Sequence, residues 1–110
     1  MIFLPIIGSR TEKIEVPLER EGEEEELLVV FAGRGEDRID LDLTMVHKTP
    51  STRGRVTVRG ILRDRAHAKI RGLIKVEKAA QKSDGFLEER TLLIGEKAQV
   101  EVYPYLEIEA

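Results

Sequence analysis

Residues 58–76, VRGILRDRAHAKIRGLIKV, carry the clearest structural pattern in this chain. From Ala66 onward the even positions are apolar or small, while the odd positions are mostly charged. Successive side chains of a β-strand point to opposite faces, so this alternation predicts strands with one buried and one solvated face. The segment also repeats itself, because Val58–Arg63 matches Ile70–Lys75 at an offset of twelve residues. A step of one strand and one turn is typical of a stacked β-solenoid, and an antiparallel β-sandwich stays open as the alternative.

The same alternation recurs outside this segment. Residues 39–45 are apolar at their odd positions, and residues 100–108 alternate apolar and polar side chains over most of their length. Residues 27–32 form a continuous apolar run, which is typical of a strand buried on both faces. Residues 19–26 are rich in glutamate without a helical apolar stripe, so we expect a solvated loop or short turn there. The pattern predicts an all-β protein.

Composition limits the chemistry that is available. With 110 residues the chain has room for one domain, which we expect to span residues 1–110. Cysteine is absent, which excludes disulfides, thiolate nucleophiles and cysteine-ligated clusters within this chain. Asparagine is absent too, and such a shortage of thermolabile amides beside abundant charge is typical of thermophiles. The apolar opening is short, is broken by Pro5 and lacks a basic lead-in, so we expect a strand in a cytoplasmic protein without a membrane span.

Charge is strongly segregated along the chain. Between Lys48 and Lys82 there are eleven basic and two acidic residues, whereas the rest of the chain has seven basic and nineteen acidic ones. Most of these basic residues have odd numbers, which places them on one face if the strands stay in phase. The candidate basic patch consists of Arg53, Arg55, Arg59, Arg63, Arg65, Lys69, Arg71 and Lys75.

Such a patch could bind phosphates or another polyanion. The competing interpretation, which the acidic remainder favours, is that neighbouring strands supply counter-charges in cross-strand ladders. Nucleic acid is not the favoured ligand, because no aromatic residue is interleaved with the basic strands.

Two further features are weaker. The two histidines, with Asp42 or Asp64, could bind a metal or transfer protons, but their spacing favours a satisfied or solvated histidine. We therefore predict no catalytic, cofactor or metal site. The outer face of the last strand carries Tyr103, Tyr105 and Glu107, which form a candidate interface or cover their own sheet.

Three pieces of the chain resemble the core of the SufB/SufD iron–sulfur assembly family. They are DLDLTMVH at residues 40–47, the segment from Arg59 to Asp84 with its Ala-Gln-Lys-Ser-Asp turn, and the segment from Leu92 to the Pro-x-Leu-Glu-Ile element that ends at Ile108. The resemblance covers Gly33 to Ala110. It implies a short right-handed parallel β-helix with two strands per coil, in which a twelve-residue step is half a coil.

The departures from this family shape the functional prediction. Family members are several times longer and continue past the Leu-Glu-Ile element into a segment that bears cysteine and histidine, whereas this chain stops at Ala110. We therefore expect a non-catalytic scaffold or interaction protein linked to iron–sulfur cluster assembly. It would form a homodimer through its C-terminal strands and contact Suf-type proteins, including the ATPase. The alternatives are a polyanion-binding module and, least favoured, a metal-dependent enzyme centred on His47.

Overall fold

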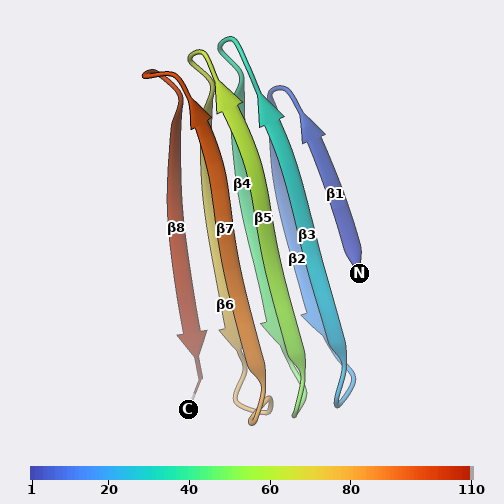
Figure 1. Ribbon diagram of the computed structural model, residues 1–110. Coiled ribbons are helices and arrows are strands. Elements are labelled where there is room, and N and C mark those ends of the chain that lie inside the picture. Colours follow the sequence, from blue (N-terminus) through green and yellow to red (C-terminus); the bar gives the residue numbers. More distant parts are fainter. Residues whose placement is uncertain (110) are drawn as a thin grey trace.

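The strands of this protein form two parallel sheets that face each other across a narrow core (Figure 1). The computed structural model describes residues 1–109, so Ala110, the last residue of the expected domain, lies outside the described residues. The strands are β1 (Ile2–Ile7), β2 (Arg10–Leu18), β3 (Glu24–Gly33), β4 (Arg38–His47), β5 (Arg53–Arg63), β6 (His67–Val76), β7 (Asp84–Ile94) and β8 (Gln99–Ile108). Within the described part, no helix is long and apolar enough to cross a membrane.

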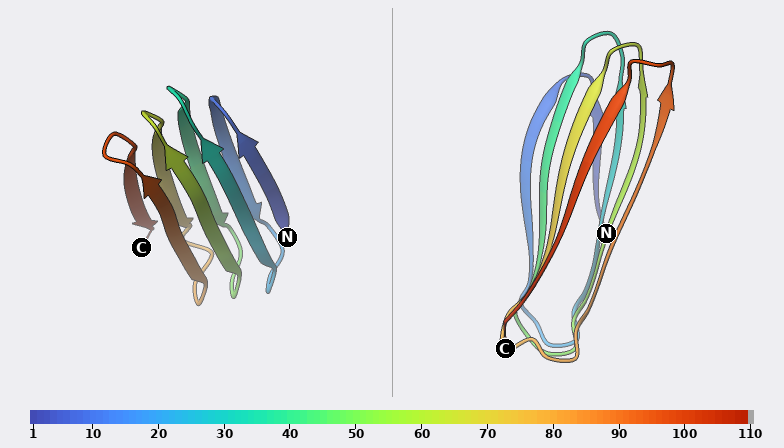
Figure 2. Two further views of the ribbon diagram at one scale, coloured as in Figure 1. Left: turned by 45° about the horizontal axis from the view of Figure 1, so that its top comes forward. Right: turned by 90° about the vertical axis from the view of Figure 1, so that its left-hand side faces the viewer.

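The chain alternates between the two sheets at every turn. Sheet A has the order β1-β3-β5-β7 and sheet B has the order β2-β4-β6-β8, and all neighbouring strands are parallel. Each coil therefore consists of one strand from each sheet, and the coils stack side by side (Figure 2). This arrangement confirms the predicted parallel β-helix with two strands per coil. It excludes the antiparallel sandwich, because hairpin-connected strands would pair with their sequence neighbours.

The length of one coil differs from the expected value. Arg10 pairs with Ile39, which is 29 positions later, and Ile39 pairs with Ala68 after another 29. In the last coil the step grows to 32, as in the pairing of Ala68 with Val100. The predicted twelve-residue half coil is therefore wrong. The matching segments lie in β5 and β6, on opposite sheets, and resemble each other because both alternate around a glycine.

The core is made by every second residue of each strand. In β3, Leu27, Val29 and Phe31 are buried, whereas Leu28 and Val30 face outward and are partly exposed. The expected burial of this strand on both faces is therefore wrong. The ring of Phe31 lies against Gly60 of the next coil, where a Cβ atom would collide with the ring. This is the aromatic side chain of the core, and it needs a glycine beside it.

The turns stack as regularly as the strands. At the lower turns in Figure 1, Gly22, Ser51 and Lys82 all have positive φ, and at the upper turns Gly35 and Asp64 do. Asp64 accepts a hydrogen bond from the Gly35 amide at 2.8 Å, so adjacent upper turns are tied together. The loop or short turn expected at residues 19–26 is correct only for residues 19–23 and wrong for Glu24–Glu26, which begin β3.

Candidate functional site

The last coil, formed by β7 and β8, presents two unpaired strand edges. Within the described residues β7 pairs only with β5, and β8 pairs only with β6. Their outer edges therefore carry backbone N–H and C=O groups that face no neighbouring strand. Such edges are templates for pairing with another chain.

The inward row of β8 is apolar but uncovered. Ile74 of β6 is 8% exposed, whereas Leu106, its register partner in β8, is 68% exposed. Ile108 in the same row is 63% exposed, and Val100 and Val102 are half-buried. The side chains have core chemistry, and they are exposed because no further coil lies over them in the described structure.

The inward row of β7 is mixed in character. Leu87 and Leu93 are apolar, but Glu89 and Thr91 lie between them and hydrogen-bond to each other. The two sheets thus end differently, because sheet B offers a continuous apolar row and sheet A interrupts its row with a carboxylate. Any partner of the last coil must accommodate this charge.

The predicted interface residues lie on the outer face of β8. Tyr105 is 55% exposed and Glu107 is exposed beside Lys75 of β6. Tyr103 packs on its own sheet, because Lys69 lies 5.6 Å from its ring and its hydroxyl donates to Glu101 at 3.0 Å. That hydrogen bond raises the pKa of Tyr103. Tyr103 therefore partly covers its own molecule, and Tyr105 is the more accessible of the two.

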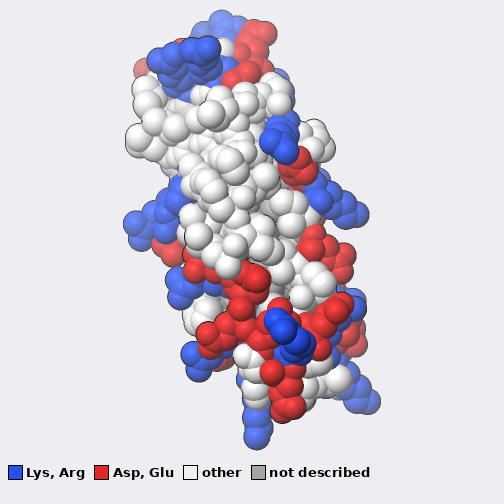
Figure 3. All heavy atoms as spheres, turned by 90° about the vertical axis from the view of Figure 1, so that its right-hand side faces the viewer, with Lys and Arg blue, Asp and Glu red and all other residues white. Residues whose placement is uncertain are grey.

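The first coil, formed by β1 and β2, exposes a second apolar surface that we had not expected from the sequence. Ile2, Phe3 and Ile7 are 41%, 54% and 89% exposed. Figure 3 shows this end of the molecule, with a continuous uncharged area above and a dense group of acidic residues below. β1 is short and pairs with Leu27–Ala32 alone, which leaves Glu24–Glu26 of β3 without a neighbouring strand on that side. The signal for this surface was the apolar start of the sequence, from which we expect only a strand.

The predicted basic patch is divided between opposite sides of the molecule. Even-numbered residues of both β5 and β6 fill the core, so their odd-numbered residues project outward from two sheets that face each other. Sheet A carries Arg53, Arg55, Arg59 and Arg63 on its outer face; sheet B carries Lys69, Arg71 and Lys75; and Arg65 lies in the turn between them. The eight residues therefore do not form one continuous surface.

Five of these eight cations lie beside carboxylates, and for three of the five the carboxylate belongs to an adjacent strand. Arg59 is 3.2 Å from Glu88, and Arg71 is 3.2 Å from Asp40 and 3.7 Å from Asp42. Further pairs are Arg53 with Asp84, Lys75 with Glu109, and Arg63 with Asp64. The geometry fits the cross-strand charge ladders that we weighed against a binding patch. Because the side chains are partly exposed, each pair contributes at most about 1 kcal/mol.

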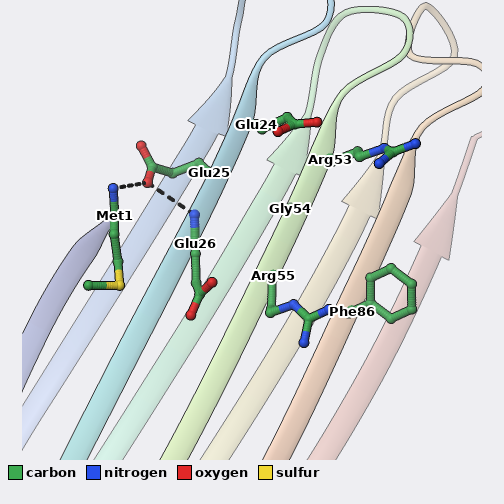
Figure 4. A pocket seen from close by; sticks show the side chains of 8 residues that line it. All are labelled: Met1, Glu24, Glu25, Glu26, Arg53, Gly54, Arg55 and Phe86. Atoms are coloured by element: carbon green, nitrogen blue, oxygen red, sulfur yellow. Dashed lines mark hydrogen bonds and ion pairs between the residues drawn. The ribbon is translucent and has the colours of Figure 1, made fainter.

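A hollow lies near the first residues of β3, β5 and β7 in sheet A, and it contains Arg55, the arginine of β5 that has no ion pair above. Figure 4 shows its lining, in which Arg55 lies beside Phe86 with its guanidinium carbon 5.4 Å from the ring centroid. Glu24, Glu25 and Glu26 line the same hollow, and the Met1 amino group lies 3.0 Å from Glu25. This ion pair lowers the pKa of Glu25. Mixed charges of this kind suit neither a polyanion nor a cation.

The two histidines lie at opposite ends of sheet B. His47 ends β4 and is fully buried, while His67 begins β6 and is partly exposed. Nδ1 of His47 is 2.8 Å from Oγ1 of Thr52, which lies 2.9 Å from Oγ of Ser83. Its Nε2 has no hydrogen-bond partner in the described structure, and burial lowers its pKa. His47 therefore acts in the framework, where it joins the turns of two adjacent coils.

Neither histidine meets the aspartates that we considered with it. Asp42 projects from the outer face of sheet B toward Arg71, while the imidazole of His47 lies inside. Asp64 lies in an upper turn and caps the Gly35 amide, whereas His67 bonds to Arg38 and Glu101. Over residues 1–109, no three histidine, aspartate or glutamate side chains are grouped so that they could hold a metal ion.

Comparisons with known proteins agree with the architecture. The model of the family described as "SUF system FeS cluster assembly, SufBD core domain" matches residues 8–110. The iron–sulfur cluster assembly protein SufD of Bacillus subtilis is 30% identical over 80 residues, which are 73% of this chain and 18% of that protein.

Two further relatives show the same short overlap. A chloroplastic SufBD family protein of Arabidopsis thaliana is 30% identical over 69 residues, or 63% of this chain and 12% of that protein. A SufBD family protein of Mycobacterium tuberculosis is 30% identical over 84 residues, or 76% of this chain and 10% of that protein. The chain thus spans less than a fifth of the length of these three relatives.

Proposed function

The chain belongs to the SufBD core domain family, and from this membership we propose that it works in iron–sulfur cluster assembly as a non-catalytic scaffold or interaction module. The observation that carries the proposal is the family match over residues 8–110, on a β-helix whose coils stack in order. Because the chain spans a small part of its relatives, only the role of a structural core is carried over.

The absence of cysteine supports a role through protein contacts. Iron–sulfur clusters are usually held by thiolates, and none is present in this sequence. A contribution to assembly would then come from surfaces that bind other proteins. We propose that these include SUF-system proteins, the ATPase among them.

The last coil is the surface best suited to such contacts. Its β8 edge offers unpaired backbone groups next to an apolar row at Leu106 and Ile108. Addition of a strand at such an edge combines backbone hydrogen bonds with burial of alternate side chains. We propose that a second copy of this chain pairs there, which gives a homodimer with the last coils at its centre.

Size-exclusion chromatography with light scattering tests the dimer. We expect a dimer at micromolar concentration, and we expect the double variant Leu106→Glu with Ile108→Glu to be monomeric because charge would be buried in the contact. Leu92→Glu is the matched control, since Leu92 is similarly exposed, at 60%, but projects from the outer face of β7. A monomeric parent protein, or loss of the dimer in the control alone, would contradict this assignment.

Affinity purification from the source cell tests the place in iron–sulfur assembly. The tagged full chain should recover a SUF-system ATPase or another assembly protein in amounts that survive washing at moderate salt. Recovery of no assembly protein would contradict the proposed pathway, while the fold would stand.

A further inference from the structure

Three cationic side chains converge at the upper turns, and one of them, Arg65, belongs to the predicted basic patch. Arg38, Arg65 and Lys97 line a hollow of about 360 Å³ together with His67 and Gln99. No carboxylate of the described residues lines this hollow. A concentration of positive charge is notable in a chain whose net charge is −3.

Coil stacking brings these residues together from distant parts of the chain. Arg38, His67 and Gln99 begin β4, β6 and β8 and are neighbours in the register of sheet B. Arg65 and Lys97 each precede a member of that row by two residues, so they occupy equivalent turn positions on adjacent coils. Neighbouring strands lie about 4.8 Å apart, so the five side chains share one small area of surface.

The charges of the three cations are not neutralised by the described residues. Within residues 1–109, no carboxylate oxygen lies within 4.0 Å of Arg38, Arg65 or Lys97, in contrast to Arg59 and Arg71 on the strand faces. Asp64 and Glu96 line the adjoining hollow with Arg65 and Lys97 but form no ion pair with them. Glu36 has the turn position equivalent to Arg65 on the preceding coil, but it forms no ion pair there in the described structure.

His67 holds Arg38 in position and also bonds to Glu101. A guanidinium can only donate, so Nη1 of Arg38 donates to Nδ1 of His67 at 3.1 Å, and Nε2 of His67 then donates to Glu101 at 2.8 Å. Glu101 also accepts from Tyr103 at 3.0 Å. These two donors turn the Glu101 carboxylate toward its own neighbours, and the hollow keeps its positive charge.

We propose that this hollow binds a phosphate group, either free or as the terminal monoester of a small molecule. Guanidinium groups present paired donors that match the oxygens of a phosphate, and a lysine adds a flexible point charge. The Gln99 side chain adds an amide donor. A dianionic oxyanion would supply the charged partner that none of the three cations has among the described residues.

Calorimetric titration of the full chain with inorganic phosphate, at constant ionic strength and pH 7.5, tests the site. We expect saturable binding, weakened about tenfold or more in Arg65→Gln and in Lys97→Gln because each loses one charged hydrogen-bond donor. Lys82→Gln is the matched control, since it removes the same charge from a lower turn and should bind as the parent does. Both tested residues are exposed, so unchanged denaturation midpoints will show that the variants fold.

Two further ligands sharpen the assignment. Binding of glycerol 3-phosphate equal to that of inorganic phosphate would identify a monoester site, and weaker binding would identify a site for the free ion. Acetate binding as tight as phosphate binding would overturn the proposal, as would an equal loss in Lys82→Gln or the absence of saturation up to about 10 mM phosphate.

Discussion

The middle coils, β3 to β6, and the last coil, β7 and β8, use similar residues with different results. Ile70 of β6 is 1% exposed, while Val102, its register partner in β8, is only half-buried. Further along the same two strands the difference between Ile74 and Leu106 is greater still. In a solenoid each coil contacts only its neighbours, so burial depends on whether a coil follows and not on the side chain itself.

The charged residues show the same contrast. On the strand faces of the middle coils, Arg71 lies between two aspartates of the neighbouring strand. At the upper turn of the last coil, Lys97 has no carboxylate within ion-pair distance in the described chain. The ion pairs of Arg71 therefore lie on a strand face, whereas the unpaired cations gather at the upper turns.

The largest expected effect compares one leucine from each region. Leu41→Ala removes a fully buried side chain of β4 and should lower the free energy of unfolding by about 2–5 kcal/mol. Leu106→Ala should cost less than about 1 kcal/mol, because that side chain is already exposed to water. Urea denaturation of dilute protein measures both, and equal losses would show that the last coil is covered.

A second comparison uses one register row, in which Gly60 pairs with Thr91. Gly60→Ala should cost about 1–3 kcal/mol, because its new methyl group collides with the Phe31 ring. Thr91→Ala removes only the hydrogen bond to Glu89 and should cost about 1 kcal/mol. If Gly60→Ala left the free energy of unfolding unchanged in the same assay, the Phe31 ring would have to move aside without cost.

The third prediction concerns pH and the buried His47. Burial lowers its pKa in the folded state, while the unfolded chain protonates near the ordinary value of about 6.5. The stability that depends on neutral His47 is therefore fully present above about pH 6.5. It is lost as the pH falls toward the folded-state pKa, by up to about 1.4 kcal/mol per pH unit.

Denaturation curves between pH 5 and pH 8 measure this slope. His47→Gln should flatten it, whereas His67→Gln, at the partly exposed histidine of the upper turns, should leave the His47 contribution in place. An unchanged slope in His47→Gln would assign the pH dependence to other groups.

The smallest expected effect concerns a lower turn. Lys82 has a φ of 62°, a conformation that costs a residue with a side chain about 1–2 kcal/mol and that glycine adopts freely. Lys82→Gly should raise the free energy of unfolding by about 0.5–1 kcal/mol, after the greater flexibility of glycine in the unfolded chain is considered. Lys82→Ala removes the same charge but keeps the strain, so a gain in both variants would attribute the effect to charge.

Several features could be predicted from the sequence because they are local. The alternation in residues 39–45 and 66–76 correctly separates inward from outward side chains, since the two-residue period is a property of the strand itself. The motifs from Gly33 to Ile108 correctly indicated the family and its β-helix. For His47 the sequence left open whether the side chain is satisfied or solvated, and the structure buries it.

Other features could not be predicted, because they depend on which strands become neighbours. The chain alone could not show that β5 and β6 face opposite directions, so the basic residues were expected on one surface. The coil repeat, which is 25 residues from β1 to β3 and 29 to 32 elsewhere, was hidden by the similarity at an offset of twelve. The candidate oxyanion site combines residues from positions 38 to 99, which no local pattern connects.

The sequence by itself thus determined that this protein is made of amphipathic strands, which side chains share the inward face of a strand and which family they resemble. The tertiary structure alone decided which of those side chains are covered, which charges meet a partner and which cations gather at a turn. The physical reason is distance along the chain. Side-chain direction is set by the dihedral angles of each residue, whereas contacts form between positions about thirty residues apart, at a register that only the stacked coils define.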